Sequence, residues 1–293
     1  MNLFDANKPF FKGNLHCHTT LSDGKLTPEQ VKQFYRERGY DFLALTDHRV
    51  VSENTHMEDG MLVLRGMEAD YSLPGEVVHL VCFGMDENVD FSDYPRMFQE
   101  CIDRCRAHGG RVIIAHPAWS LNTLATLSGL YDVTAAEIYN SASTYPWNGD
   151  RADSSSILDV AAAHGTFFNF VASDDSHWYN GEAGRSFTMV QADELTPESL
   201  LKAFDSGRFY CSQGPAFEQI SVQDGKIEVS CSPVSRVIFY SNAVWAFSRC
   251  VTGEELTHAS YDLTRNANQH ETHVRIQIMD TQGRSAWSNP IIL

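Results

Sequence analysis

The sequence predicts an α/β fold in which a closed or nearly closed barrel of βα units is followed by a small all-β domain. Up to about residue 213, short apolar runs alternate with amphipathic stretches that carry helix-capping residues. After that point the pattern changes to apolar–polar alternation around turns, without helix signals. The 43% hydrophobic content of the 293 residues is ample for packed cores and excludes disorder as the main state. We therefore expect two domains, at residues 1–213 and 214–293.

Seven apolar runs predict the strands of the first domain. They are residues 13–18, 42–46, 62–67, 77–83, 112–115, 135–139 and 167–172. Helix signals lie between several of these runs, which favours parallel βα units. Seven such strands suit a closed or nearly closed barrel.

Four helices are predicted between the strands, each from its capping residues. The segment TPEQ at 27–30 combines an N-cap Thr, a first-turn Pro and a capping-box Gln, and this helix stops at Gly39. The other three end before glycines as well, which is typical of helix C-termini. They are expected at residues 94–108, 155–164 and 196–206.

The second domain is expected to be a small, sandwich-like all-β unit. Alternating apolar positions flank the turn residues Asp224 and Gly225, as in a hairpin. A second alternating run at 274–278 is followed by a turn at 281–283. The chain then closes on an apolar segment, which indicates that this domain docks on something.

Composition restricts the partners and the compartment. With 22 Lys+Arg against 38 Asp+Glu, the formal charge is −16, and no basic run is present, which excludes duplex nucleic acid as the expected partner. No apolar run is long enough to span a membrane, and no secretory leader is visible. The seven cysteines are scattered and form no CxxC pair, so we expect a cytoplasmic protein. The oligomeric state stays open.

Histidines and carboxylates gather where the predicted strands end. His16 and His18 stand two residues apart, so in an extended chain both point to the same face. The other candidates lie at later strand ends, on the fourth strand or in adjoining loops. They are Asp23, His48, Glu68, His79, His116, Asp175 and His177.

Each of these signals is weak by itself, because a histidine pair on a strand or an Asp-His turn is common without any ligand. Their coincidence at successive strand ends favours a shared site, since the carboxyl ends of parallel strands meet at one edge. Neutral imidazoles and carboxylates are ligands for Zn²⁺, Mn²⁺ and Fe²⁺, so the sequence predicts a metal site. No GxSxG nucleophile motif and no glycine-rich phosphate loop accompanies it.

In order along the chain, LHCHTTLSDG, ALTDH, GMEAD, AHP and SDDSH resemble the motifs of the PHP (polymerase and histidinol phosphatase) superfamily, over about residues 10–213. The resemblance implies a distorted seven-stranded βα barrel with two or three divalent cations in its mouth, and hydrolysis of phosphate esters. The SDG loop resembles the branch with nucleoside 3′,5′-bisphosphate phosphatases and oligoribonucleases. SDDSH, RFYCSQGP and RSAWSNPIIL resemble a branch that carries an extra β domain.

By motif, the resemblance implies three cation sites, two of which share Glu68 as a bridge. They are His16, His18, Glu68 and Asp175; Glu68, His79 and His116; and Asp23, His48 and His177. The cations would be Mn²⁺, Zn²⁺ or Fe²⁺, and we expect Glu68, Asp175 and His177 to take part in catalysis. Asp47 and Asp174 stand beside ligands and are expected to orient imidazole N–H groups.

The expected function is a metal-dependent phosphoesterase that releases phosphate from a small phosphate ester, with a nucleotide as one candidate. Water held between two cations has a lowered pKa, and the resulting hydroxide is the expected nucleophile. The same chemistry would hydrolyse a carboxylic ester, amide or carbamate, which is the first alternative. A binding protein that uses its β domain is the second.

Contacts to the substrate are less well marked in the sequence. Arg49, Arg151 and Arg185 are the candidates to hold a phosphate group at the barrel mouth. Trp119 would either stack on a base or sugar or pack its own loop, and packing is favoured.

Overall fold

The computed structural model describes residues 2–293, with the side chains of all of these except residues 267 and 269. The helices are α1 (Pro28–Arg36), α2 (Phe98–Ala107), α3 (Leu124–Ser128), α4 (Ser155–Ala163) and α5 (Pro197–Asp205). The first strands are β1 (Phe10–Asn14), β2 (Phe42–Leu45), β3 (His56–Glu58), β4 (Met61–Leu73), β5 (Glu76–Phe83), β6 (Arg111–Ile114), β7 (Ala135–Asn140) and β8 (Asn169–Ser173). The later strands are β9 (Phe187–Gln191), β10 (Phe209–Ser212), β11 (Phe217–Gln223), β12 (Lys226–Ser241), β13 (Cys250–Asp262), β14 (His273–Met279), β15 (Ser285–Ser288) and β16 (Ile291–Ile292).

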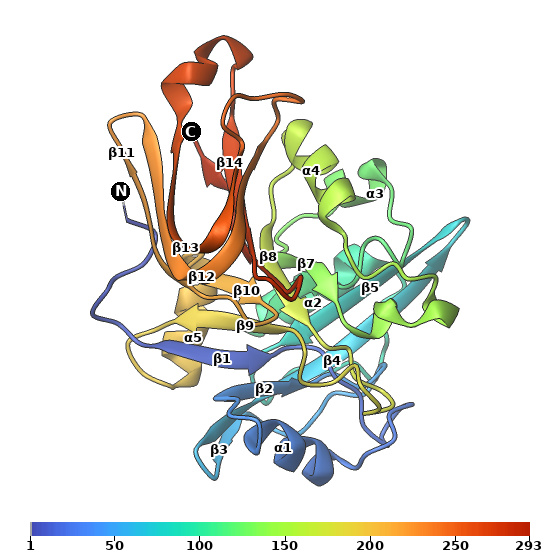
Figure 1. The fold of residues 1–293 in the computed structure, drawn as a ribbon. Coiled ribbons are helices and arrows are strands. Elements are labelled where there is room, and N and C mark those ends of the chain that lie inside the picture. Colours follow the sequence, from blue (N-terminus) through green and yellow to red (C-terminus); the bar gives the residue numbers. More distant parts are fainter. Residues whose placement is uncertain (1) are drawn as a thin grey trace.

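Each of the seven runs predicted as strands overlaps a strand, and these strands follow one another across the sheet in the order β1-β2-β4-β5-β6-β7-β8 (Figure 1). The run predicted at 13–18 overlaps β1 only at residues 13 and 14, so His16 and His18 lie beyond the strand. The two ends of this series meet beyond the strands themselves. The chain after β8 pairs in parallel with the chain after β1, where His18 N donates to Ser176 O at 2.9 Å and Asp175 N donates to His16 O at 2.9 Å. These bonds fix the predicted ligand segments side by side.

The expectation of parallel βα units is wrong for one part of the sheet. Strand β5 runs antiparallel to both β4 and β6, and no helix separates it from β4. Only Pro74 and Gly75 connect β4 to β5, with Gly75 at φ +86°. A two-residue connection closes a hairpin, whereas a parallel crossover needs a dozen residues or more.

The sheet continues on the other side of β1 through two strands that the sequence analysis missed. Strand β9 pairs antiparallel with β1, and β10 pairs antiparallel with β9. Strand β10 also pairs with β15, which joins the later strands β11–β16 to the same sheet. These later strands stand together at one end of the molecule (Figure 1).

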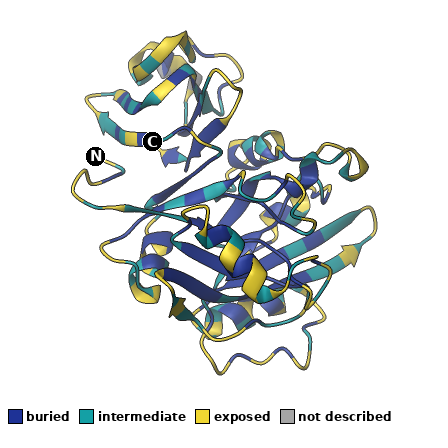
Figure 2. Ribbon diagram, turned by 60° about the horizontal axis from the view of Figure 1, so that its bottom comes forward, coloured by how far each residue is buried: buried dark blue, intermediate teal, exposed yellow. Residues whose placement is uncertain are grey.

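The later strands have an apolar core of their own. The side chains of β11, β12 and β14 form one apolar cluster that includes Ile220, Val229 and Ile276. Three further apolar clusters lie mainly among the strands that precede β11 and the helices packed on them. Figure 2 shows buried strands and helices whose outer faces are exposed.

The predicted helices are present within a few residues at each end. Thr27 caps α1 with the capping box that TPEQ predicts: its side chain accepts from Gln30 N, and the Gln30 side chain accepts from Thr27 N. The short helix α3 and a 3₁₀ turn at 263–269 were not predicted. In the part of the chain that is described, no helix is both long and apolar enough to cross a membrane.

Strand β14 and helix α4 are joined by an ion pair between a buried arginine and a partly buried aspartate. Arg275 is 1% exposed, and its Nε and Nη2 atoms donate to the Asp159 carboxylate at 2.5 and 2.6 Å. The guanidinium also lies over the Tyr240 ring, 3.9 Å from its centroid. A bidentate pair of this kind fixes the orientation of both partners.

We expect Asp159→Ala to lower the free energy of unfolding by about 2 kcal/mol, because it leaves a buried guanidinium without its anion. Urea denaturation followed by tryptophan fluorescence measures the change. Asp193→Ala is the matched control, since it removes an exposed pair with Lys8, and we expect it to change stability far less. Equal effects of the two substitutions would contradict the structural role of the Asp159–Arg275 pair.

Candidate metal centre

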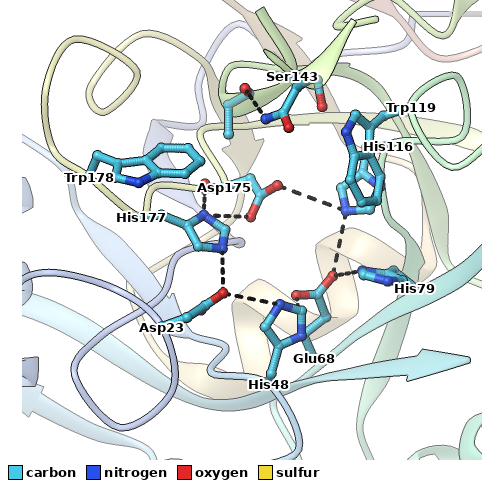
Figure 3. A pocket seen from close by; sticks show the side chains of 12 residues that line it. Asp23, His48, Glu68, His79, His116, Trp119, Ser143, Asp175, His177 and Trp178 are labelled. Carbon is cyan, nitrogen blue, oxygen red and sulfur yellow. Dashed lines mark hydrogen bonds and ion pairs between the residues drawn. The ribbon is translucent and has the colours of Figure 1, made fainter. Parts of the chain in front are cut away.

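All nine predicted ligands come together at one end of the sheet, around a cavity of about 190 Å³ (Figure 3). Its lining is mostly imidazole, carboxylate and indole. The residues are Asp23, His48, Glu68, His79, His116, Trp119, Ala142, Ser143, Asn148, Asp175, His177 and Trp178. His16 and His18 lie behind Glu68 and Asp175, within 3.2 Å of both carboxylates.

Glu68, on β4, is the centre of the site. Its Oε2 atom lies 3.2 Å from each of three imidazole nitrogens, in His16, His18 and His48. Its Oε1 atom faces another pair, with His79 Nδ1 at 2.8 Å and His116 Nε2 at 3.5 Å. The two oxygens of one buried carboxylate therefore face two separate sets of nitrogen ligands.

Asp175 closes the first of these sets from the opposite strand. Its Oδ1 atom lies 3.2 Å from His16 Nε2 and 3.0 Å from His18 Nε2. One ligand atom from each of His16, His18, Glu68 and Asp175 falls within 4.8 Å of all the others. This is the set that the motifs implied for a first cation.

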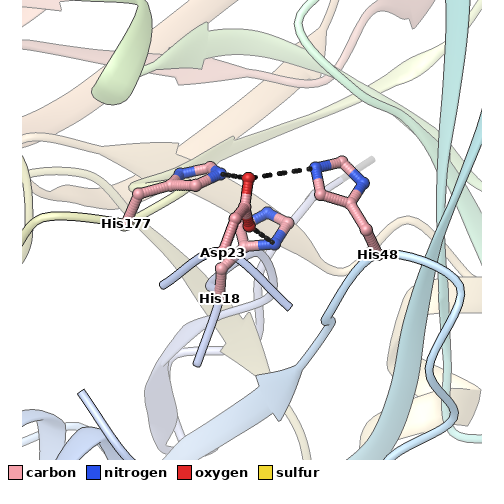
Figure 4. A group of neighbouring side chains, drawn as sticks. All are labelled: His18, Asp23, His48 and His177. Carbon is pink, nitrogen blue, oxygen red and sulfur yellow. Dashed lines mark ion pairs between the residues drawn. The ribbon is translucent and has the colours of Figure 1, made fainter. Parts of the chain in front are cut away.

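A second group surrounds Asp23 at the mouth of the cavity (Figure 4). Its Oδ1 lies 3.5 Å from His18 Nδ1, and its Oδ2 lies 3.5 Å from His177 Nε2 and 3.9 Å from His48 Nε2. The group thus contains the three expected residues and also His18, whose two ring nitrogens face different groups.

A third group joins His48, Glu68 and His79, while His116 stands at its edge, 3.5 Å from Glu68 Oε1. The position of His79 follows from the direction of β5. Because β5 runs antiparallel to β4, His79 pairs with Asp70, two residues along β4 from Glu68. His79 and Glu68 therefore reach the site from within their strands, and the other predicted ligands reach it from segments that follow strands.

Two buried atoms of the site have no hydrogen-bond partner among the described residues: Glu68 Oε2 and His48 Nδ1. They lie 3.2 Å apart. Unpaired buried polar atoms are costly, and a carboxylate oxygen facing imidazole nitrogens is the donor set that a divalent cation takes. The residues therefore fit a metal ion.

Electrostatics indicate the same need for positive charge. Burial disfavours the imidazolium of His16, yet the carboxylates of Asp175, Glu68 and Glu137 raise its pKa well above the ordinary value. The pKa of His18 rises to about 9 against the same burial, through Asp175 and Glu68. Burial would raise the pKa of Glu68, but the surrounding imidazoles lower it well below its usual range. Divalent cations would supply this charge in place of protons.

Two of the predicted ligands have unusual backbone conformations. Asp175 has φ +52° and His116 has φ +31°, in the left-handed region that few L-residues adopt. His116 also precedes Pro117, which restricts its backbone further. Strain of this kind persists only where surrounding structure enforces it and is concentrated at functional sites.

The sequence analysis missed Glu137, a fully buried carboxylate on β7. Its Oε1 lies 2.8 Å from His16 Nδ1, and its Oε2 accepts from the backbone N of His116 at 2.8 Å. Asn140 Nδ2 donates to the same Oε2 atom at 2.8 Å. The available signal in the sequence was a carboxylate within the mostly apolar run AAEIYN, since a carboxylate on a buried strand needs a partner.

Asp47 and Asp174 do not orient imidazoles, contrary to expectation. Asp47 accepts from Thr19 N and Ser22 N, so it holds the loop that carries Asp23. Asp174 accepts from Tyr35 Oη and from backbone N–H groups at 184–186. Both carboxylates therefore support the segments that carry ligands rather than the ligands themselves.

The three candidate arginines do not line the cavity. Arg49 forms a bidentate pair with Asp70, at 2.9 and 2.7 Å, and faces a separate cavity beside Tyr94. Arg151 and Arg185 are exposed. Trp119 does line the cavity, with its indole edge-on to His79 and His116 at centroid distances of 5.7 and 4.8 Å.

One further cluster of ligand-type residues, Glu53, His56 and Glu58, lies outside the site. Lys32 Nζ already occupies it, 3.0 Å from Glu53 and 2.7 Å from Glu58. These carboxylates have their positive partner, so the cluster is an ion-pair network.

No family model matches the chain. One curated protein, a 5′-3′ exoribonuclease of Haemophilus influenzae, is 32% identical over 81 residues, which cover 26% of this chain and 30% of that protein. An amidohydrolase structure from Chromobacterium violaceum is 17% identical, covers 59% of this chain and 89% of its own, and has a TM-score of 0.41.

A likeness of greater extent is found with a two-domain protein from Bacteroides vulgatus, described as containing a predicted PHP-like metal-dependent phosphoesterase. It covers 99% of this chain and 96% of its own, with a TM-score of 0.55 at 16% identity. This likeness shows that the chain shares the fold of that two-domain protein, in agreement with the resemblance that the motifs carry.

Proposed function

We propose that the protein is a metal-dependent hydrolase that releases phosphate from a small phosphate ester. The observation that carries the proposal is the position of Glu68. Its two buried oxygens face two sets of imidazoles, which is the arrangement of a carboxylate that bridges two cations.

In this proposal the predicted ligands hold two or three divalent cations, of the class Mn²⁺, Zn²⁺ or Fe²⁺. His16, His18, Glu68 and Asp175 hold the first. Glu68, His79 and His116, with His48 beside them, hold the second. Asp23, His48, His177 and His18 hold the third. Bound cations lower the pKa of water and polarise phosphoryl oxygens, which is the chemistry they would supply.

The chain's own residues position these groups and supply no nucleophile in our proposal. Cys17 lies between two proposed ligands, yet its thiol is fully buried and donates to Ala44 O, away from the cavity. Burial and nearby carboxylates raise the pKa of this thiol well above its ordinary value. Asp175 and His177 lie at the cavity beside Glu68, and we assign all three to catalysis.

We also propose that residues 1–213 and 214–293 act as two domains. Strands β1, β2 and β4–β8 would form the distorted seven-stranded barrel, and β11–β16 the accessory β domain. The separate apolar cluster of the later strands supports this division. The pairing of β10 with β15 shows that the two parts share a sheet.

Two findings support a phosphate ester as substrate. The motif set resembles that of phosphoester hydrolases in its order along the chain, and the Haemophilus influenzae protein that shares an 81-residue match is a 5′-3′ exoribonuclease, whose RNA substrate is a phosphodiester. A nucleotide is therefore the first substrate type to test.

One observation favours a second candidate function, hydrolysis of a carboxylic ester, amide or carbamate. The described residues that line the cavity include no Lys or Arg. Sites that bind phosphate commonly add such cations to their metals, whereas a neutral carbonyl substrate needs none.

The phosphoesterase proposal predicts phosphate release from a panel of phosphomonoesters and nucleoside 3′,5′-bisphosphates in the presence of Mn²⁺. Because the cations activate the water and bind the phosphoryl group, we expect a chelator to remove the activity and added Mn²⁺ to restore it. Absence of release from a fully metal-loaded sample would favour the carbonyl substrates instead.

We expect Glu68→Ala to lower activity by about 100-fold or more and to remove at least one equivalent of bound metal, because two cation sites share this carboxylate. Elemental analysis after dialysis measures the metal content. Glu53→Ala is the control, since Glu53 belongs to the histidine–carboxylate cluster that Lys32 neutralises. Full metal content in Glu68→Ala would refute the bridging role.

We expect Glu137→Gln to lower activity by about 10- to 100-fold, because an amide holds the His16 ring less firmly than the carboxylate does. Steady-state kinetics and metal titration measure the effect. A thermal melt distinguishes loss of the fold from loss of the site, and wild-type kinetics in a folded variant would count against this role.

A further inference from the structure

The wall of the cavity opposite Glu68 includes side chains that the metal proposal does not use, from two loops. Ser143 and Asn148 belong to the segment that follows β7, and Trp178 follows the last proposed ligand, His177. In Figure 3, Trp178 lies beside His177 on one side of the cavity and Trp119 lies beside His116 on the other. The opening is therefore flanked by two indoles.

Trp178 is part of a cluster of aromatic rings at the rim, which we call the aromatic rim: Tyr145, Trp147 and Trp178. Tyr145 and Trp147 are stacked, with centroids 4.3 Å apart and planes at 11°. Both stand edge-to-face with Trp178, at 5.3 and 5.8 Å. Trp147 is 68% exposed and Trp178 36% exposed. Large apolar side chains exposed beside a cavity mark a binding surface.

A buried carboxylate holds the aromatic rim in place. Glu182 is 1% exposed, and its Oε1 accepts from the backbone N of Trp178 and of Tyr179, both at 2.6 Å. Its Oε2 accepts from Tyr145 Oη at 2.8 Å. One side chain thus ties the loop of Trp178 to the loop of Tyr145 and Trp147. A rim that is ordered in advance loses little conformational entropy when it binds a ring.

The charges around the cavity limit what else a substrate can carry. Among the described lining residues there is no Lys or Arg, and Arg49 is already paired with Asp70. Asp23 is half exposed at the mouth. Within the cavity, an anionic group away from the cations would meet no lysine or arginine among the described lining residues and would face a carboxylate, which disfavours it.

We propose that the aromatic rim binds a neutral, planar ring in the leaving group of a phosphate monoester, so that the substrate carries its charge only at the reacting phosphate. This inference rests on the proposed phosphoesterase function and narrows it to one class of substrate. Trp178 supplies the contact nearest the cavity, and Trp147 and Tyr145 extend it outward.

The test compares two compounds that differ only in the ring. Adenosine 5′-monophosphate and ribose 5-phosphate have the same phosphate and the same leaving oxygen, and only the first carries a base. We expect the metal-loaded wild-type protein to favour the nucleotide in kcat/KM by about ten-fold or more, since stacking on aromatic side chains supplies a gain of that size.

Trp178→Ala should lower this preference about ten-fold, mainly through a higher KM for the nucleotide. Damage to the neighbouring His177 would lower both rates equally and leave their ratio unchanged, so the ratio isolates the ring contact. Trp178→Phe keeps a ring on the rim and should retain most of the preference. Trp245→Ala removes another exposed tryptophan, between β12 and β13, and should leave the ratio at its wild-type value.

A second phosphate tests the charge argument. We expect adenosine 3′,5′-bisphosphate to have a kcat/KM at least about ten-fold below that of the monophosphate, because its extra charge meets no lysine or arginine among the described lining residues of the cavity. A bisphosphate that is turned over faster, or an unchanged ratio in Trp178→Ala, would overturn the inference while the phosphoesterase proposal stands. Absence of chelator-sensitive release from every phosphate ester would overturn both.

Discussion

The burial of three carboxylates without a lysine or arginine partner is the constraint on which the site depends. Glu68, Asp175 and Glu137 are all buried, and their close contacts in the described chain are imidazoles, an asparagine amide and backbone N–H groups. A buried anion needs positive charge or several hydrogen bonds beside it, and most of the groups that face these carboxylates are imidazoles. The imidazoles can supply that charge by taking up protons, but divalent cations supply it without requiring every ring to be protonated.

This electrostatic demand explains features of the fold that otherwise look costly. The hydrogen bonds between the segments after β1 and β8 hold Asp175 against His16 and His18, and they do so with Asp175 in a left-handed backbone conformation. Strand β5 reverses direction and pairs His79 with Asp70, which brings the His79 ring within 2.8 Å of Glu68. In both places the backbone departs from a regular parallel βα arrangement. Each departure brings a carboxylate and an imidazole close together.

Most of the fold and the residues of the candidate site could be predicted from the sequence, because the signals are local. Capping residues placed α1. His16 and His18 do meet, with their Nε2 atoms 3.2 Å apart, although both lie beyond β1 and not on the strand that was expected. What could not be predicted depends on side-chain direction and strand polarity. Arg49 follows a ligand in sequence, yet it turns to Asp70. Glu137 lies in the middle of an apolar strand, where nothing local shows that it faces His16.

Two separate groups of residues contribute to the choice of substrate. Positive charge at the site would come from cations held by imidazoles and carboxylates, since none of the described lining residues is a lysine or arginine. Apolar contact comes from the aromatic rim. Glu182 joins the two loops of this rim through hydrogen bonds that involve no side chain of a proposed ligand. Charge therefore acts on the reacting group and dispersion acts on the rest of the substrate. Because the two contributions rest on different residues, a change at the rim can alter which leaving group is bound while the groups that act on the phosphate stay in place.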